Sequence, residues 1–340
     1  MKLDLQLLEE IFSIDSPTGY THDVIDFLDK YISDLGYQTE RNKKGNLIVT
    51  VNGKTDYTLG LSAHVDTLGL MVRSIMPNGH LRIINLGGLL FPSLDGEYCR
   101  IHTRNGKVYT GTILSTSPSV HVYKDSRTKT RDDDNMYIRI DEKVSSKKDT
   151  LALGIDNGDF VAIDTKFEFT DSGYVKTRFL DDKASVFILV TYLQRLKEMN
   201  KTPECNLKIL FTTYEEVGHG ASQIPALDEL LAVDMGCIGT DLSCNEEQVS
   251  ICAKDASGPY DYQMVSKLIE LAKKEEINYA VDIYPFYSSD ASAALRAGAD
   301  IKGALIGPGI HASHGMERTH IEGIINTIKL IESYVDNINK

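Results

Sequence analysis

The chain has 340 residues, of which 42% are hydrophobic and 25% charged, and its formal net charge is −13. This composition is that of a folded globular protein, and the length favours a large domain plus a smaller one. The negative charge argues against binding to nucleic acid or to an anionic membrane. Its apolar stretches are shorter than the ~18 to 20 residues that cross a bilayer, and the first residues do not resemble a targeting segment. Five cysteines without a Cys-x-x-Cys pair indicate a reducing, cytoplasmic location and argue against a thiolate zinc site.

The first part of the chain alternates helical and strand patterns. Apolar spacing predicts helices over residues 4–13 and 22–35 and strands over residues 47–51 and 57–63. From residue 69 to 163 the pattern changes to β-hairpins, such as MVRSI and LRIINL on either side of PNGH. Within that region the charged segment 122–136 lacks periodicity, which predicts a mobile loop.

Helices and strands alternate again after residue 163. We expect helices over 182–198, 260–274 and 290–297, strands over 207–212, 236–240, 278–283 and 303–306, and a last helix with Ile321, Ile324, Ile325, Ile328, Ile331 and Val335 on one face. The sequence therefore predicts an α/β fold, in which residues 1–68 and 164–340 form a central mixed sheet flanked by helices. Residues 69–163 are predicted to form an inserted, small β-barrel-like domain.

Several side chains of the types that bind metals stand at the ends of these apolar runs. His64 ends the strand 57–63, and Asp66 would point to the same side, where a carboxylate can accept the second imidazole N–H. Asp181 and Asp182 both open a helix, although helix capping explains only one of them. Each of these motifs taken alone is common without any function.

The later strands repeat the arrangement. Glu215 and Glu216 follow the strand 207–212, and Asp241 follows the strand 236–240, at the strand ends where open α/β sheets bind ligands. His311, His314 and His320 precede the last helix, and any of the three is a candidate ligand. A set of His, Asp and Glu donors with one spare carboxylate suits two divalent ions and predicts a two-metal hydrolase.

In this order, the motifs AHVD, LDDK, YEEVG and TD, followed by a histidine before the last helix, resemble the glutamyl-aminopeptidase-like family of cocatalytic metallopeptidases, which includes the tetrahedral aminopeptidases. The opening LLEEIFSIDSPTGYTHDV and KKGNLIV are similar to the family's first helix and Gly-Asn strand. INLGG, IHTRNGKVYTGTI and LGIDNGDFV resemble its inserted β domain. The resemblance spans nearly the whole chain and implies a phosphorylase/hydrolase-like catalytic domain.

The resemblance implies a role for each matching residue. The metal ligands would be His64, Asp181, Glu216, Asp241 and His314, with Asp181 bridging the two ions; Glu215 would be the general base, and Asp66 and Asp182 would support them. It also implies a cis peptide bond between Asp181 and Asp182. This chain departs from the family pattern at Glu317, which comes one place early after the histidine, and at Lys183 and Ser185, which replace Arg and Gly.

The implied activity is removal of N-terminal residues from peptides by a homo-oligomer that holds two divalent ions, zinc or cobalt, in each subunit. The inserted domain would serve oligomerisation, with dimers building to a dodecamer. Two alternatives are a metal-dependent deacylase, amidase or carboxypeptidase-type hydrolase on the same core, and a catalytically silent assembly protein. The intact ligand set with Glu215 argues against the silent protein, and the β domain argues against the deacylase.

Overall fold

The computed structural model describes residues 1 and 3–338, which form two compact units. The first unit comprises Met1–Thr67 and Lys166–Lys340, and the second comprises Leu68–Thr165. The chain therefore passes between the units at 67/68 and 165/166, against the 68/69 and 163/164 expected from the sequence.

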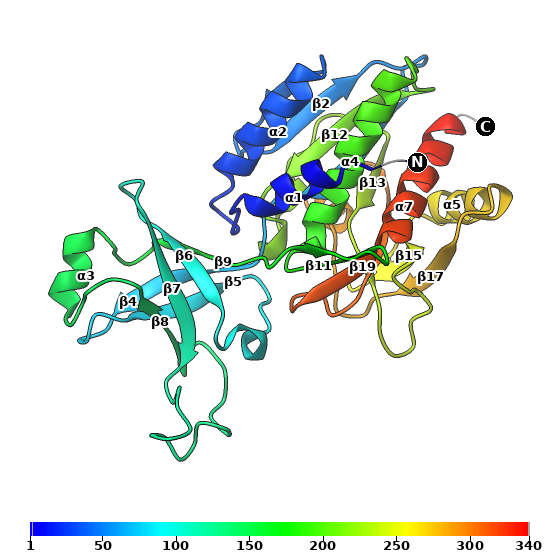
Figure 1. Ribbon diagram of the computed structural model, residues 1–340. Coiled ribbons are helices and arrows are strands. Elements are labelled where there is room, and N and C mark those ends of the chain that lie inside the picture. Colours follow the sequence, from blue (N-terminus) through cyan, green and yellow to red (C-terminus); the bar gives the residue numbers. More distant parts are fainter. Residues whose placement is uncertain (2, 339–340) are drawn as a thin grey trace. The chain divides into compact units, whose positions relative to one another are not determined.

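A mixed ten-stranded sheet is the centre of the first unit (Figure 1). Its main order is β1 (Gln38–Arg41), β2 (Leu47–Val51), β12 (Asn206–Thr212), β3 (Thr58–His64), β13 (Glu229–Val233), β18 (Lys302–Ile310), β15 (Val249–Asp255) and β16 (Gly258–Pro259), with β14 (Gly236–Cys237) beside β18 and β17 (Tyr279–Ile283) beside β15. The four central strands β12, β3, β13 and β18 are mutually parallel, whereas β2 and β15 run antiparallel to their central neighbours. The predicted mixed sheet is confirmed.

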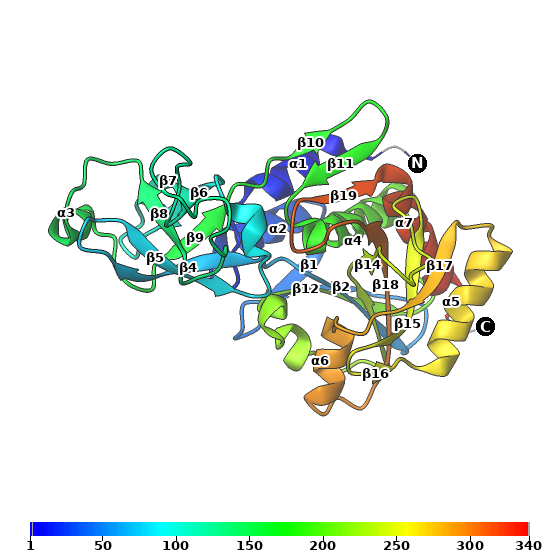
Figure 2. The same cartoon turned by 90° about the horizontal axis from the view of Figure 1, so that it is seen from below.

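Helices cover both faces of this sheet. They are α1 (Leu5–Ser13), α2 (His22–Asp34), α4 (Leu180–Glu198), α5 (Tyr262–Lys274), α6 (Asp290–Arg296) and α7 (Ile321–Asp336). Figure 2 shows α4 and α7 on one side of the sheet and α6 on the other. Helix α4 is buried on nearly all sides because it packs against the sheet, α1 and α7, and its run Val186–Val190 is apolar throughout. On α7 the predicted apolar face is buried, except that Ile321 and Ile325 are half-buried.

A small three-stranded sheet joins two distant parts of the first unit. Strands β10 (Glu168–Phe169), β11 (Tyr174–Thr177) and β19 (Glu317–His320) pair antiparallel, and Thr177 lies opposite Glu317. The chain enters α4 directly after β11, so this pairing brings the start of α4 beside the segment that precedes α7. Neither β11 nor β19 was predicted, since both are short and carry few apolar residues.

The second unit is a closed six-stranded antiparallel barrel. Its order is β4 (Gly69–Ile75), β5 (Leu81–Leu86), β8 (Met136–Ile140), β7 (Val108–Ser115), β6 (Tyr98–His102) and β9 (Phe160–Ile163), with the helix α3 (Lys147–Leu153) outside it. The Asn-Gly turn between β6 and β7 puts Gly106 at φ +80°, where glycine is favoured. Most of the charged segment 122–136 runs through turns before β8. Among the described residues no helix is long and apolar enough to cross a membrane.

One predicted strand was wrong in position. The residues 236–240 form only the two-residue β14 and then a turn, whereas the central strand is β13, seven residues earlier. All five residues of β13 are buried between β3 and β18. The apolar run continues across Asp234 from LLAV into MGCIG, so the composition did not show which half pairs in the sheet.

Candidate metal centre

The carboxyl ends of the four central parallel strands carry the candidate site. His64 is the last residue of β3 and lies in register with Thr212, the last residue of β12. Asp234 follows directly after β13, and the loop after β18 leads to His314. Because parallel strands end at the same edge of a sheet, residues that are far apart in the sequence meet there.

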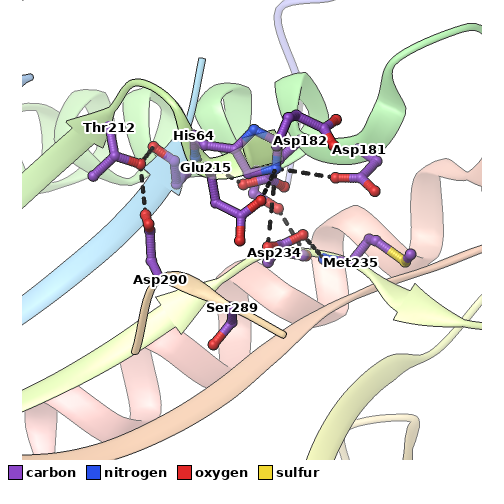
Figure 3. Close-up of polar contacts among 12 residues, drawn as sticks. His64, Asp181, Asp182, Thr212, Glu215, Asp234, Met235, Ser289 and Asp290 are labelled. Atoms are coloured by element: carbon purple, nitrogen blue, oxygen red, sulfur yellow. Dashed lines mark hydrogen bonds and ion pairs between the residues drawn. The ribbon is translucent and has the colours of Figure 1, made fainter. Parts of the chain in front are cut away.

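His64 is the most connected residue of the site (Figure 3). Its Nε2 atom lies 3.1 Å from an oxygen of Asp181, 3.8 Å from Glu215 and 4.0 Å from Asp234. The imidazole is buried, and its Nδ1 atom lies 2.8 Å from the backbone oxygen of Asp66, which fixes the orientation of the ring. One edge of the ring therefore faces three carboxylates from three different elements.

Asp66 supports the site in a different way from the one predicted. Its carboxylate is 3.8 Å from Nδ1 of His64, so the backbone carbonyl, not the side chain, is the closer partner of the ring. The two carboxylate oxygens instead accept the backbone N–H groups of Glu215 and Glu216, at 3.1 and 3.2 Å. Asp66 thus fixes the turn that carries both glutamates.

The peptide bond between Asp181 and Asp182 is cis, as expected. Asp181 directs one oxygen to His64 and the other to Nε2 of His314, at 3.1 and 3.4 Å. Asp182 is fully buried behind His64 and accepts its backbone N–H at 3.1 Å. Asp181 is therefore the carboxylate that lies between the two histidines.

Glu215 and Glu216 lie on a short 3-10 turn, Glu215–Val217, after β12. A carboxylate of Glu216 lies 3.8 Å from Nε2 of His314, while Glu215 faces His64. The two acids therefore face different histidines.

The following loop is held by Asp290, at the start of α6, and by Lys44. Asp290 accepts hydrogen bonds from the backbone N–H of Ala221 at 2.8 Å and from the hydroxyl of Thr212 at 2.5 Å (Figure 3). The ammonium group of Lys44 contacts the carbonyl of Gly220 at 2.8 Å. A Cβ atom on Gly220 would come within 2.2 Å of the Asp290 carboxylate, so glycine is required at that close approach. Sequence reasoning missed Asp290, since an Asp at a helix start is usually a cap.

His314 is the histidine that reaches the site. It has a φ of +64° and leads into a turn whose geometry Glu317 holds, accepting the backbone N–H of His314 at 2.9 Å and that of Asp181 at 3.1 Å. Burial and the nearby Asp181 raise the pKa of Glu317 to about 8. His311 is exposed, and His320 accepts the N–H of Glu322 at the start of α7. Although Glu317 stands one place earlier than in the family pattern, it still links the segment around His314 to the start of α4.

The structure does not bring Asp241 into the cluster. Asp241 is exposed in the turn after β14, with a φ of +62°, and Asp234 occupies the position beside His64. The hydroxyl of Ser185 donates to the backbone oxygen of Asp234 at 2.9 Å, which ties this segment to α4. Asp234 ends an apolar strand as His64 does, so the same sequence signal would have found it if the strand had been located correctly.

Burial dominates the electrostatics of these acids. It raises the pKa of Glu215 and Glu216 well above the usual value, and the nearby negative charges add to this effect. Burial, followed by the charge of Asp181, raises the pKa of Asp234 to about 7. Without cations, each of these carboxyl groups therefore keeps its proton to a higher pH than an exposed acid does.

Asp181 behaves differently from the other acids. Burial favours a raised pKa, but hydrogen bonds from His314 and His64 outweigh it and lower the pKa below the usual value. For His64, burial favours a lowered pKa, but Asp181 and Glu215 raise it well above its usual range. The imidazole groups of His64 and His314 therefore stabilise the charged form of the Asp181 carboxylate.

The residues fit divalent cations. Ligand atoms of His64, Asp182 and Asp234 lie within 4.8 Å of one another, and so do those of His64, Asp181 and Glu216. One oxygen of Asp182 and one of Glu216 are buried without a hydrogen-bond partner among the described residues, although a buried polar atom normally has one. Mixed imidazole and carboxylate donors suit zinc, cobalt and similar ions.

A cavity of about 710 Å³ adjoins this cluster. His314 and Met235, the residue after Asp234, form part of its wall, and the rest comes mainly from the segments 240–242 and 283–287. A pocket beside a cluster of perturbed acids is the usual setting of an active site.

Comparison with known proteins defines the class as aminopeptidases. The fold matches the TET aminopeptidase of Thaumarchaeota archaeon SCGC AB-539-E09 with a TM-score of 0.89, at 19% identity over 98% of this chain and 97% of that one. It matches the TET1 peptidase of Pyrococcus horikoshii, which can assemble into a tetrahedron or a large octahedral shell, with a TM-score of 0.87, at 25% identity over 98% and 99% of the two chains. The sequence is 47% identical over 336 residues to YhfE of Bacillus subtilis (strain 168), named as a candidate aminopeptidase, covering 98% and 97% of the two chains.

Residues 45–330 match the M42 glutamyl aminopeptidase family, and the chain belongs to that family. The resemblance drawn from the motifs is confirmed. The protein is accordingly a peptidase, an enzyme that hydrolyses peptide bonds, of a metal-dependent family.

Proposed function

We propose that the protein removes N-terminal residues from peptides with two divalent ions, zinc or cobalt, in each subunit. His64, Asp181 and Asp234 would hold one ion, and Asp181, Glu216 and His314 would hold the other. The observation that carries the proposal is the position of Asp181, whose two oxygens face His64 and His314 separately. Asp234 takes the place of Asp241 in this set because a carboxylate oxygen of Asp234 lies 4.0 Å from Nε2 of His64.

Glu215 is the proposed general base. It lies 3.8 Å from His64, is almost buried, and is the carboxylate of the pair that faces away from His314. When bound, the ions would supply Lewis-acid stabilisation and make water acidic enough to react near neutral pH. Glu215 takes the proton of the attacking water and gives it to the departing amine. Asp66 holds the turn of Glu215 through its backbone N–H, which keeps the carboxylate aimed at the reacting groups.

The experiment compares free aminoacyl anilides with N-acetylated amino acids, using protein stripped with a chelator and then supplied with zinc or cobalt. Hydrolysis of the free aminoacyl anilides, restored by metal, supports the proposal. Cleavage of only the acylated substrates would favour the deacylase, and no cleavage of either by metal-loaded protein would favour the silent assembly protein. Metal analysis of the loaded protein should give two ions per chain.

We further propose that the enzyme is a homo-oligomer in the cytoplasm, with the barrel unit serving assembly from dimers to a dodecamer. The assembly of the Pyrococcus horikoshii relative supports the first part, and five free thiols support a reducing compartment. Light scattering of the purified protein tests the assembly, since a mass of a single 37.8 kDa chain would contradict it.

A further inference from the structure

The cavity beside the metal centre has walls of two kinds. Most of the lining is apolar or aromatic, and the residues that matter here are Met235, Leu242, Ile283, Tyr284, Phe286 and Tyr287. Phe286 is 98% exposed and Ile283 is 54% exposed, so the protein leaves large apolar groups uncovered at this cavity. A bound side chain would cover them, which favours a long or bulky residue.

Asp241 supplies the negative charge of the lining. Its carboxylate makes no hydrogen bond or ion pair with another described residue, and the turn from Gly239 to Leu242 holds its backbone in the left-handed region. Aspartate tolerates that conformation better than most residues. The lining contains no lysine or arginine among the described residues, and its one histidine, His314, faces Asp181 and Glu216.

We propose that Asp241 selects peptides whose first residue is basic, lysine or arginine. This inference rests on the proposed aminopeptidase function, in which the first side chain of the peptide enters the cavity next to His314. A lysine or arginine side chain has an apolar stem that fits the apolar walls and a cationic end that pairs with a carboxylate. An acidic first residue would meet the carboxylate of Asp241 and would be repelled.

A neutral residue of the same length is the sharpest competitor. Norleucine has the four-carbon stem of lysine without its ammonium group, so it gains the same contact with the walls and no ion pair. The comparison of lysyl and norleucyl p-nitroanilides therefore isolates the charge. Because Asp241 is exposed, the effect is that of a solvent-screened ion pair, and we expect kcat/KM for lysine to exceed that for norleucine about two- to fivefold. The preference should decline as salt is added.

The test uses the metal-loaded full-length protein and two matched variants. In Asp241→Asn the lysine-to-norleucine ratio should fall about two- to fivefold, mainly through KM, because the contact is made equally in the bound substrate and in the transition state. Asp300→Asn removes an exposed carboxylate elsewhere and should leave the ratio unchanged. Asp241→Lys should reverse the preference toward glutamyl anilide.

The outcomes separate the two proposals. If the wild-type protein cleaves norleucyl anilide at least as well as lysyl anilide, and Asp241→Asn leaves the ratio unchanged, the role of Asp241 is wrong while the aminopeptidase function stands. If the metal-loaded protein cleaves no aminoacyl anilide, both proposals are wrong. A ratio that falls equally in Asp300→Asn would show an effect of overall charge and would also overturn the role of Asp241.

Discussion

The two units of the molecule differ in how many carboxylates they bury and in how closely these carboxylates gather. In the barrel unit, Asp159 is the buried carboxylate among the described residues, and it accepts the backbone N–H groups of Asp156 and Arg104. The sheet unit buries many more, and they are Asp66, Asp181, Asp182, Glu229, Asp234, Asp255, Asp282, Asp290 and Glu317. Three of these, Asp181, Asp182 and Asp234, gather around His64, and one oxygen of Asp182 has no hydrogen-bond partner among the described residues. Since burial of an unpaired charge is costly, the sheet unit is arranged for a positive ligand, and the barrel is complete without one.

Replacing Asp181, a buried acid of the sheet unit, should have the largest effect on metal binding and on turnover. Asp181→Ala removes the carboxylate that faces both histidines, so we expect loss of both ions and of all measurable turnover. Elemental analysis after dialysis against zinc measures the first, and an aminoacyl anilide assay the second. Glu142→Ala, which removes an exposed acid of the barrel unit, should change neither. Two ions retained by Asp181→Ala would mean that another group, such as Asp182, bridges them.

Glu215→Gln should separate binding from chemistry in the same cluster. The amide keeps the size of the side chain but cannot take a proton, so both ions should remain while kcat falls about 10²- to 10⁴-fold. The measurement is kcat together with metal content for the same preparation. Near-normal turnover in this variant would remove Glu215 from the role of general base.

Asp290→Ala tests whether a buried acid that is not one of the proposed metal ligands contributes to catalysis. It removes the acceptor that ties Ala221, in the loop after Glu215, to Thr212 at the end of β12. We expect kcat to fall about 10- to 100-fold, since small misplacements of reacting groups are costly. Asp290→Asn, which can still accept one of these bonds, should recover most of the loss. Metal content should be unchanged in both variants, and equal losses of metal and kcat would indicate a general structural role instead.

The stability of the metal-free protein should depend on pH in a characteristic direction. Burial raises the pKa of Asp234 to about 7 and of Glu317 to about 8, against about 4 in an unfolded chain. The folded state therefore binds more protons than the unfolded state between about pH 4 and 8, and the free energy of unfolding falls as pH rises through that window.

Thermal unfolding of chelator-treated protein from pH 5 to 8 measures this effect as a midpoint that declines by several degrees. Asp234→Asn should decline less because its amide does not ionise. Zinc should oppose the decline, because deprotonation favours binding of the ion. A midpoint that rises over the same range in the metal-free protein would contradict the raised pKa values.

The sequence predicted most of the residues that gather around His64, because they follow regular elements. His64 and the pair Glu215 and Glu216 stand at the ends of apolar strands, and that pattern is visible without a structure. Asp234 escaped because apolar residues flank it on both sides, and only the pairing of β13 with β3 and β18 shows where the strand ends. Glu317 and Asp290 act through backbone N–H groups, and such contacts depend on turns that side-chain patterns do not specify.

The discontinuous first unit also has a consequence for synthesis of the chain on the ribosome. Strand β3 is translated before the whole barrel, yet both of its neighbours in the sheet, β12 and β13, come after it. The hydrogen bond from the Glu215 N–H to Asp66 spans 149 positions. The barrel is an uninterrupted stretch that a nascent polypeptide can complete first, while His64 must wait for its partners. A barrel completed first would hold its two ends side by side through the pairing of β4 with β9, and so keep the flanking segments close together until the last helix emerges.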